Sequence, residues 1–259
     1  MPKSNENYCL MNCCGAWDQV NRDPTDMIVC ETVQPEQLER RLVAINTGRN
    51  KMSQDRLKSI IAFLKEAEQL KLIERIPYLS DRVRRENDAE HSWYLALLLL
   101  SLEEELEIEF DQLKTYKMIM VHDLVEVYTK DDWAYDKEKK KLKQEREVKA
   151  AKKLFSLLPP DLSKKFLSLW QEYDAGKTIE AKIAKALDKI CYTLQYSISK
   201  KIEWGKACTK QESYDYAFPH VSCNKTLLNL FEALLDELEE TIDRHNKKIM
   251  AKATEVKVQ

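Results

Sequence analysis

Hydrophobic residues recur at helical spacing over most of the chain after residue 52. A clear example follows Ser53, a candidate N-cap, where apolar residues stand at positions i, i+3, i+4 and i+7: Leu57, Ile60, Ile61 and Leu64. Similar patterns predict helices from residue 87 or 88 to about 107 and over 112–129, 137–158, 161–173, 178–204 and 222–249. No alternating strand pattern of useful length and no internal repeat occurs. The sequence therefore predicts an all-α fold, a bundle of about seven helices.

Breaks in the pattern divide the chain. Residues 1–50 are polar and have no sustained helical period, so we expect a weakly ordered N-terminal extension. The compact domain is expected over residues 51–250, followed by a C-terminal tail, 251–259. Within the domain, Pro77 interrupts a polar, arginine-rich segment from Arg75 to Glu86, which is predicted to be a loop. The Lys- and Glu-dense face over 137–158 is typical of a solvated helix.

Composition narrows the class of protein. The chain has 44% hydrophobic and 33% charged residues and a formal net charge of −2, which suits a globular protein and gives no reason to expect nucleic acid or an anionic membrane as partner. The longest apolar run, Leu95 to Leu102, has eight residues and is too short to span a bilayer. No secretory signal is visible, so we expect a cytoplasmic protein.

The cysteines also favour a cytoplasmic location. Their odd number, seven, together with the missing secretory signal, favours reduced thiols in the cytosol. Four lie in the first thirty residues, at Cys9, Cys13, Cys14 and Cys30. A zinc site built from these four is an alternative, but they lack the paired C-x-x-C spacing.

The candidate chemistry lies around two histidines. The chain has only four, and His91 and His122 both lie in partly apolar helical segments. Asp123 follows His122 directly, and burying an imidazole beside a carboxylate is costly unless a cation compensates it. A divalent metal ion is the simplest such cation. Glu126, four residues after His122 and three after Asp123, shares their face of the predicted helix.

A further ligand is expected from a later helix. Asp188 is the best candidate, because apolar residues surround it at helical spacing. The alternative is a surface aspartate that pairs with Lys185 or Lys189.

Three separate segments carry a resemblance to a known family. In the segments Arg84–Trp93, His122–Glu126 and Ala184–Asp188, the order His, His-Asp, Asp resembles the signature of the HD-domain metal-dependent phosphohydrolases. The three segments also resemble those of the bacterial-type HD hydrolases grouped with 5'-deoxynucleotidases, and the resemblance covers about residues 53–200. It implies an HD-domain helical bundle and a homodimer.

The resemblance also implies roles for individual residues. The metal ligands would be His91, His122, Asp123 and Asp188. Glu126 matches the family's catalytic glutamate, and Asp131 matches an acidic residue at the substrate. The chain departs from the pattern at Lys130, where these relatives often carry glycine.

Two arginines are candidates for binding the phosphate. Arg84 aligns best by its distance from His91, and Arg75 is the second candidate. The alternative for either is an exposed cation.

Two imidazoles and two carboxylates suit one divalent ion with open positions for water: Mn, Co, Fe, Ni, Mg or Zn. A second ion is not expected, because His220 and His245 lie outside the matching segments. The implied activity is release of phosphate from a small phosphomonoester, a nucleoside or deoxynucleoside 5'-monophosphate, by metal-activated water. Two alternatives are an iron-dependent oxygenase using the same histidines and carboxylates, and a non-catalytic metal or nucleotide sensor.

Overall fold

A computed structural model describes residues 54–129, 137–204 and 206–256. The predicted extension, 1–50, with its four cysteines, lies outside this part of the chain, as do Ser53, Lys130 and Asp131.

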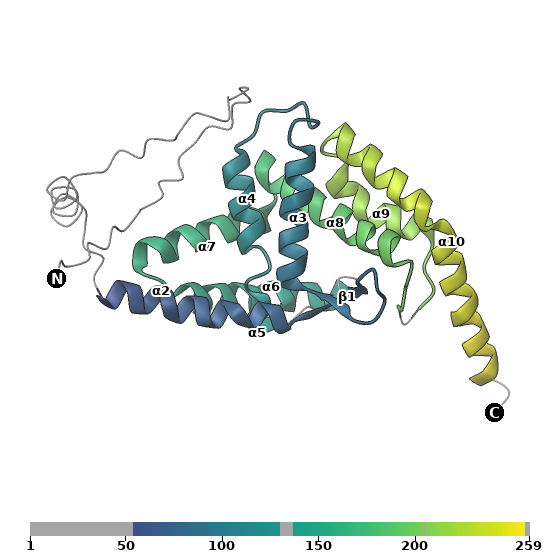
Figure 1. Cartoon of the computed structure of the whole chain (residues 1–259), viewed down its shortest axis with the longest axis horizontal. Coiled ribbons are helices and arrows are strands. Elements are labelled where there is room, and N and C mark those ends of the chain that lie inside the picture. The colour runs from purple at the N-terminus through teal and green to yellow at the C-terminus, as the bar shows by residue number, and fades with distance from the viewer. Residues whose placement is uncertain (1–53, 130–136, 205, 257–259) are drawn as a thin grey trace, which may run out of the picture. The chain divides into compact units, whose positions relative to one another are not determined.

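Helices make up nearly all of the regular structure, so the predicted all-α class is confirmed (Figure 1). The elements are, in chain order, α2 (Gln54–Ala67), the 3-10 helix η1 (Glu68–Leu72), β1 (Glu74–Tyr78), β2 (Arg85–Asn87), α3 (Asp88–Leu102), α4 (Gln112–Val121), α5 (Glu126–Thr129), α6 (Lys137–Phe155), α7 (Pro160–Ala175), α8 (Ile179–Ser199), α9 (Lys210–Val221) and α10 (Lys225–Val256). Among these residues, no helix is long and apolar enough to cross a membrane.

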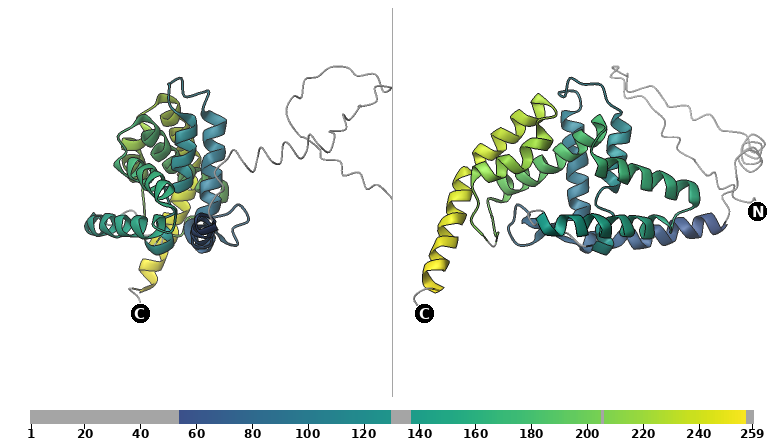
Figure 2. Two further views of the ribbon diagram at one scale, coloured as in Figure 1. Left: turned by 90° about the vertical axis from the view of Figure 1, so that its left-hand side faces the viewer. Right: turned by 180° about the vertical axis from the view of Figure 1, so that it is seen from behind.

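Helix α8 is the central element of the described domain. It packs against α3, α4, α7, α9, α10 and β1 (Figures 1 and 2). Its inward residues are completely buried: Ala181, Ile183, Ala184, Ala186, Leu187, Ile190 and Cys191. Thr178 caps its start by accepting a hydrogen bond from the Ala181 amide, and Lys200, with φ of 50°, ends it in the left-handed region.

Two hydrophobic cores meet where α4 ends. The first surrounds α8 and includes Met118 and Ile119 of α4. The second lies between α2, α6 and α7 and includes Val121 and Leu124. The segment that carries His122 is therefore held by packing on both sides.

The predicted loop from Arg75 to Glu86 is wrong at both ends, where two strands form, and right for residues 79–84 between them. Strands β1 and β2 pair antiparallel, with Glu74 opposite Asn87 and Tyr78 opposite Arg85. Burial alternates along β1, but one of the two inward positions is Arg75, which a pattern of hydrophobic residues does not reveal.

The single helix predicted over 112–129 is also wrong, because α4 stops at Val121 and α5 starts at Glu126. Between them, backbone bonds join residues three apart, from the Leu124 amide to the Val121 carbonyl and from the Glu126 amide to the Asp123 carbonyl. Such a tightened turn within a helical stretch often marks a functional site.

Other boundaries differ from the predicted ones. The helix after residue 87 ends at Leu102 rather than near 107, and α10 continues to Val256 rather than 249. Helix α9 was not predicted, because Pro219 lies inside it and only Ala217 and Val221 are buried along it. Its start is nevertheless well specified by the capping box of Thr209 and Glu212.

Candidate active site

The four predicted metal ligands come together between α3, the end of α4 and α8. A capping box between Asn87 and Glu90 fixes the start of α3 and places His91 in its first turn. His91 Nε2 lies 3.1 Å from Asp188 Oδ1 and 3.9 Å from Asp123 Oδ2, and His122 Nε2 lies 2.9 Å from Asp123 Oδ2. Ligand atoms of His91, His122 and Asp123 all fall within 4.8 Å of one another.

The ring of His122 is oriented to present Nε2 to this cluster. Its Nδ1 lies 2.7 Å from the carbonyl oxygen of Ile119. Because a carbonyl oxygen can only accept, Nδ1 carries the ring hydrogen and donates a hydrogen bond to it. In the neutral ring, Nε2 then has a lone pair that faces the Asp123 carboxylate. Such a contact is unfavourable unless a cation or proton lies between the two atoms, which is the arrangement that a metal-binding histidine requires.

The ring of His91 is oriented in the same sense. Its Nε2 points to the carboxylates, while its Nδ1 lies 3.8 Å from Glu86 Oε2 on the outer side. Burial and the nearby Arg75 lower the pKa of His91 to about 4, so the ring is neutral at pH 7, as a ligand must be. Burial raises the pKa of Glu86 to about 7 against the opposing effect of Arg75.

The aspartates are held as carboxylates by the cations and histidine rings around them. Burial alone would raise the pKa of Asp123, but His122 and Arg75 hold it well below its usual range. For Asp188, Lys189 and His91 likewise outweigh burial and lower the pKa. Both groups are therefore negatively charged at neutral pH.

Asp188 faces the histidine cluster and also pairs with Lys189, but it is not the surface aspartate of the alternative, because its side chain is only 14% exposed. Its Oδ1 faces His91, while its Oδ2 accepts a hydrogen bond from Lys189 Nζ at 2.8 Å. Pairing with a neighbouring lysine and facing the histidine cluster are thus compatible.

Of the two candidate arginines, Arg75 lies at the cluster. Its Nη1 is 3.0 Å from Asp88 Oδ1 and 2.9 Å from Asp123 Oδ2, and its side chain is only 10% exposed. Arg84 has a half-exposed side chain and forms a two-pronged ion pair with Glu90 at 2.5 and 2.8 Å. The structure therefore reverses the order of preference that spacing suggested.

Glu126 is buried at the start of α5, and its amide donates to the Asp123 carbonyl at 2.9 Å. The other acidic candidate, Asp131, lies outside the described residues. The position of Glu126 after the tightened turn replaces the expected placement on one continuous helix with His122.

Three residues at the site were not singled out from the sequence for a role there. Glu86 and Asp88 flank Arg75, and the only signal for them is an acidic segment just before His91. Tyr173 of α7 packs its ring 5.1 Å from the ring of His122, and burial raises its pKa well above the usual range. No spacing relates Tyr173 to the histidines, so only the fold reveals it.

Comparisons with known proteins agree with this geometry. Residues 67–225 match the family model described as HD domain. The chain belongs to the HD-domain family.

Among similar proteins, the 5'-deoxynucleotidase HDDC2 of Homo sapiens is 30% identical over 159 residues, which cover 61% of this chain and 76% of that protein. A solved structure from Magnetospirillum magnetotacticum, described as a predicted metal-dependent phosphohydrolase, is 35% identical with a TM-score of 0.65, over 74% of this chain and 98% of that one. A solved HD-domain phosphohydrolase from Listeria innocua is 19% identical with a TM-score of 0.52, and the match covers 74% of this chain and 99% of that one. At this identity the similarity supports the fold alone.

The resemblance drawn from the three sequence segments is thus confirmed at the level of the family. The chain is an enzyme of the HD-domain phosphohydrolase type, and its His-His-Asp cluster fits a divalent metal ion.

Proposed function

We propose that this chain releases phosphate from a (deoxy)nucleoside 5'-monophosphate, with one divalent ion held by His91, His122, Asp123 and Asp188. The observation that carries the ligand assignment is the His122 ring, whose Nδ1 is bonded to the Ile119 carbonyl and whose Nε2 faces a carboxylate. The substrate class is supported by the similarity to HDDC2, which is named as a 5'-deoxynucleotidase. When bound, such an ion lowers the pKa of a coordinated water and polarises a phosphoryl oxygen.

Arg75 is the residue that we assign to the phosphate. Its guanidinium lies against Asp88 and Asp123, so it reaches the position where a phosphoryl group beside the ligands would lie. A guanidinium can donate two parallel hydrogen bonds to phosphate oxygens. The same Nη1 atom also donates to Asp88, and this second bond limits the motion of the guanidinium.

Glu126 is the candidate proton acceptor. It is buried, and its turn of helix begins three residues after Asp123. A carboxylate there can take a proton from the attacking water. For Asp131, a role at the substrate is proposed from the family resemblance alone. His91 and His122 remain neutral ligands in this scheme.

The test is phosphate release from nucleoside and deoxynucleoside monophosphates with Mn, Co, Mg, Ni or Zn. We expect His122→Ala to lose both metal and turnover. Full metal content by elemental analysis in that variant would show the ligand assignment to be wrong. Tight nucleotide binding without turnover with every metal would favour a sensor, and oxygen consumption with iron and reductant would favour the oxygenase alternative.

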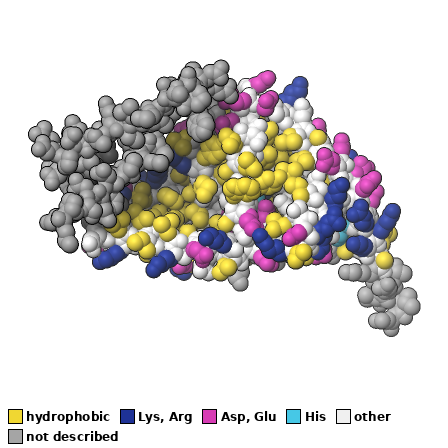
Figure 3. All heavy atoms as spheres, viewed as in Figure 1, with side chains coloured by type: hydrophobic (Ala, Val, Ile, Leu, Met, Phe, Trp, Pro, Cys, Tyr) yellow, Lys and Arg dark blue, Asp and Glu magenta, His cyan; other side chains and the backbone are white. Residues whose placement is uncertain are grey.

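We further propose that the protein is a homodimer that associates through the faces of α3 and α4. Large apolar side chains are exposed there, including Trp93 at 65%, Leu100 at 60% and Leu113 at 63%. They line a groove with Leu97 and Tyr116, and Figure 3 shows a continuous hydrophobic area on this side of the molecule.

The size of this area fits association with a second copy. The exposed fractions correspond to roughly 450 Å² of apolar side-chain surface. A standard interface buries about 800 Å² per partner, of which about 60% is apolar, so this face supplies about the apolar area that one side requires. The acidic residue in the groove, Glu103, accepts a hydrogen bond from the Tyr116 hydroxyl at 2.9 Å, which holds its carboxylate within its own subunit.

A further inference from the structure

Lys189 is bonded to the candidate ligand that directly precedes it in the chain. Its Nζ lies 2.8 Å from Asp188 Oδ2, and its side chain is 21% exposed. Adjacent side chains on a helix point in different directions, so this contact requires the lysine chain to bend back toward its neighbour.

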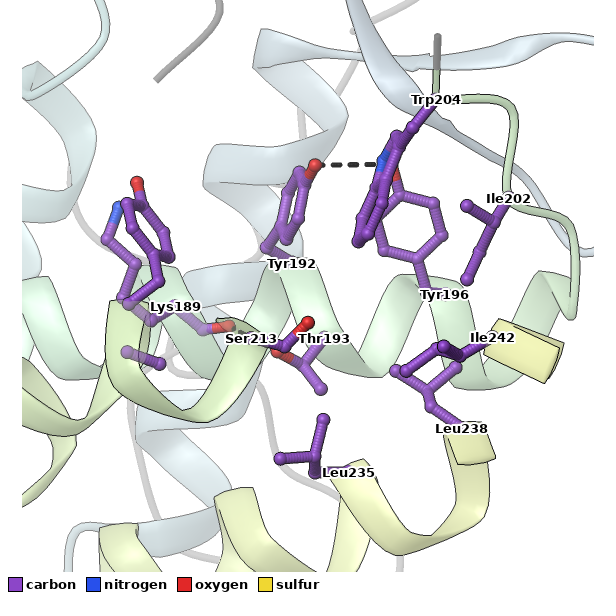
Figure 4. Close-up of a pocket in the computed structure, with 12 residues that line it drawn as sticks. Lys189, Tyr192, Thr193, Tyr196, Ile202, Trp204, Ser213, Leu235, Leu238 and Ile242 are labelled. Atoms are coloured by element: carbon purple, nitrogen blue, oxygen red, sulfur yellow. Dashed lines mark hydrogen bonds between the residues drawn. The ribbon is translucent and has the colours of Figure 1, made fainter. Parts of the chain in front are cut away.

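Helix α9 supplies the group that holds the lysine there. The ring of Tyr216 lies 5.3 Å from Lys189 Nζ, within the range of an attraction between a cation and an aromatic ring. Figure 4 shows Lys189 at one end of a small cavity, of about 30 Å³, which α8, α9 and α10 enclose. The lysine thus lies between this cavity and the histidine cluster.

Because of its hydrogen bond with Lys189, the two carboxylate oxygens of Asp188 have different partners. Oδ2 accepts from Lys189, while Oδ1 faces His91 Nε2 at 3.1 Å and Arg75 Nη2 at 3.9 Å. A carboxylate that is free to rotate would present either oxygen, or both, to a metal ion. Here, one oxygen is already occupied.

We propose that Lys189 is a positioning residue, which holds Asp188 so that Oδ1 alone enters the metal site, and that Tyr216 of α9 holds Lys189 in turn. This inference rests on the proposed metal centre and extends it to a helix that carries none of the ligands. Outer partners of this kind typically contribute 10- to 100-fold to metal affinity.

A different effect of the same contact has the opposite sign. If Lys189 competed with the metal for Asp188, its removal would free a ligand and strengthen metal binding. The direction of the change in affinity therefore separates positioning from competition.

The experiment measures Mn²⁺ affinity by calorimetric titration of the metal-free full chain. We expect Lys189→Met to bind Mn²⁺ about 10- to 100-fold more weakly than wild type. Lys189→Arg, which keeps a donor, should recover part of the loss. Lys182→Met, on an exposed position of the same helix, should leave the affinity unchanged.

Two further variants complete the test. Tyr216→Leu, which removes the aromatic ring, should weaken Mn²⁺ binding several-fold, and this variant serves if Lys189→Met does not fold by circular dichroism. His122→Ala reports on the metal centre itself. Unchanged or tighter binding in Lys189→Met, together with loss of binding in His122→Ala, would overturn the positioning role alone. Unchanged binding in both would overturn the metal centre and this inference with it.

Discussion

Arg75 offers the sharpest test of the site, because it is a buried cation among the carboxylates assigned to the metal. We consider Arg75→Met, which keeps the length of the side chain and removes its charge. In wild type, Nη1 lies within 3.0 Å of both Asp88 and Asp123, and the side chain is 10% exposed. Removing one partner of a buried ion pair costs about 3–5 kcal/mol, because the remaining charge is left uncompensated.

This cost converts to a measurable shift. In a domain of this size, each kcal/mol lowers Tm by about 2–4 °C, so metal-free Arg75→Met should melt roughly 6–20 °C below wild type. A divalent ion supplies positive charge to the same carboxylates. Adding Mn²⁺ should therefore raise the Tm of the variant by more than the Tm of wild type.

The kinetic prediction is separate. A hydrogen bond to a charged group contributes about 1.5–3 kcal/mol, so loss of the phosphate contact should lower kcat/KM by roughly 10- to 150-fold with saturating metal. Arg84→Met is the matched control, since the structure places Arg84 at the half-exposed pair with Glu90. It should leave kcat/KM within a factor of about two.

The assays are thermal melts by circular dichroism with EDTA or Mn²⁺, and phosphate release at several substrate concentrations. Equal Tm values for Arg75→Met and Arg84→Met without metal would refute the electrostatic reasoning. A loss of kcat/KM in Arg84→Met alone would restore the order of preference that the sequence spacing suggested.

Three further predictions follow from other parts of the molecule. Glu126→Ala should keep its metal and its KM but lose roughly 10²–10⁴-fold in kcat; an unchanged kcat would exclude it as the proton acceptor. Leu100→Glu should shift the protein from dimer to monomer in sedimentation experiments, and an unchanged mass would remove α3 from the interface. Arg56 lowers the pKa of Asp161 to about 2 through a two-pronged bond, so this ion pair stabilises the fold above the unfolded-state pKa of about 4. The Tm difference between wild type and Arg56→Met should be constant well above pH 4, shrink between about pH 4 and 2, and disappear below about pH 2; a difference of constant size across this range would contradict the assignment.

Amphipathic pattern predicted the helical class, because most helices here bury one face. The amphipathic pattern failed where a buried residue is charged. Arg75 takes an inward position of β1 that an apolar residue would normally fill, and only its carboxylate partners on other segments make that position favourable. A sequence pattern that scores arginine as exposed predicts a loop there.

The candidate ligands were predictable from the sequence for a different reason. They lie in short segments whose order resembles a family, so their identity does not depend on correct helix boundaries. The residues that contact these ligands from other helices could not be predicted in this way. Tyr173 and Tyr216 come from α7 and α9, and their relation to the site depends on how these helices pack against α8.

The error at the end of α4 has a physical link to the chemistry. The last carbonyl groups of a helix lack partners within it. In α4, the Met118 carbonyl accepts from the His122 amide and the Val121 carbonyl accepts from the Leu124 amide, while the Ile119 carbonyl accepts from His122 Nδ1. The side chain of His122 therefore satisfies a carbonyl that the helix end would leave open, and this same bond fixes the tautomer that presents Nε2 to the carboxylates. A continuous helix over 112–129 would use the Ile119 carbonyl for the amide four residues later. The helix end that the apolar pattern concealed is thus part of what prepares His122 to bind a metal.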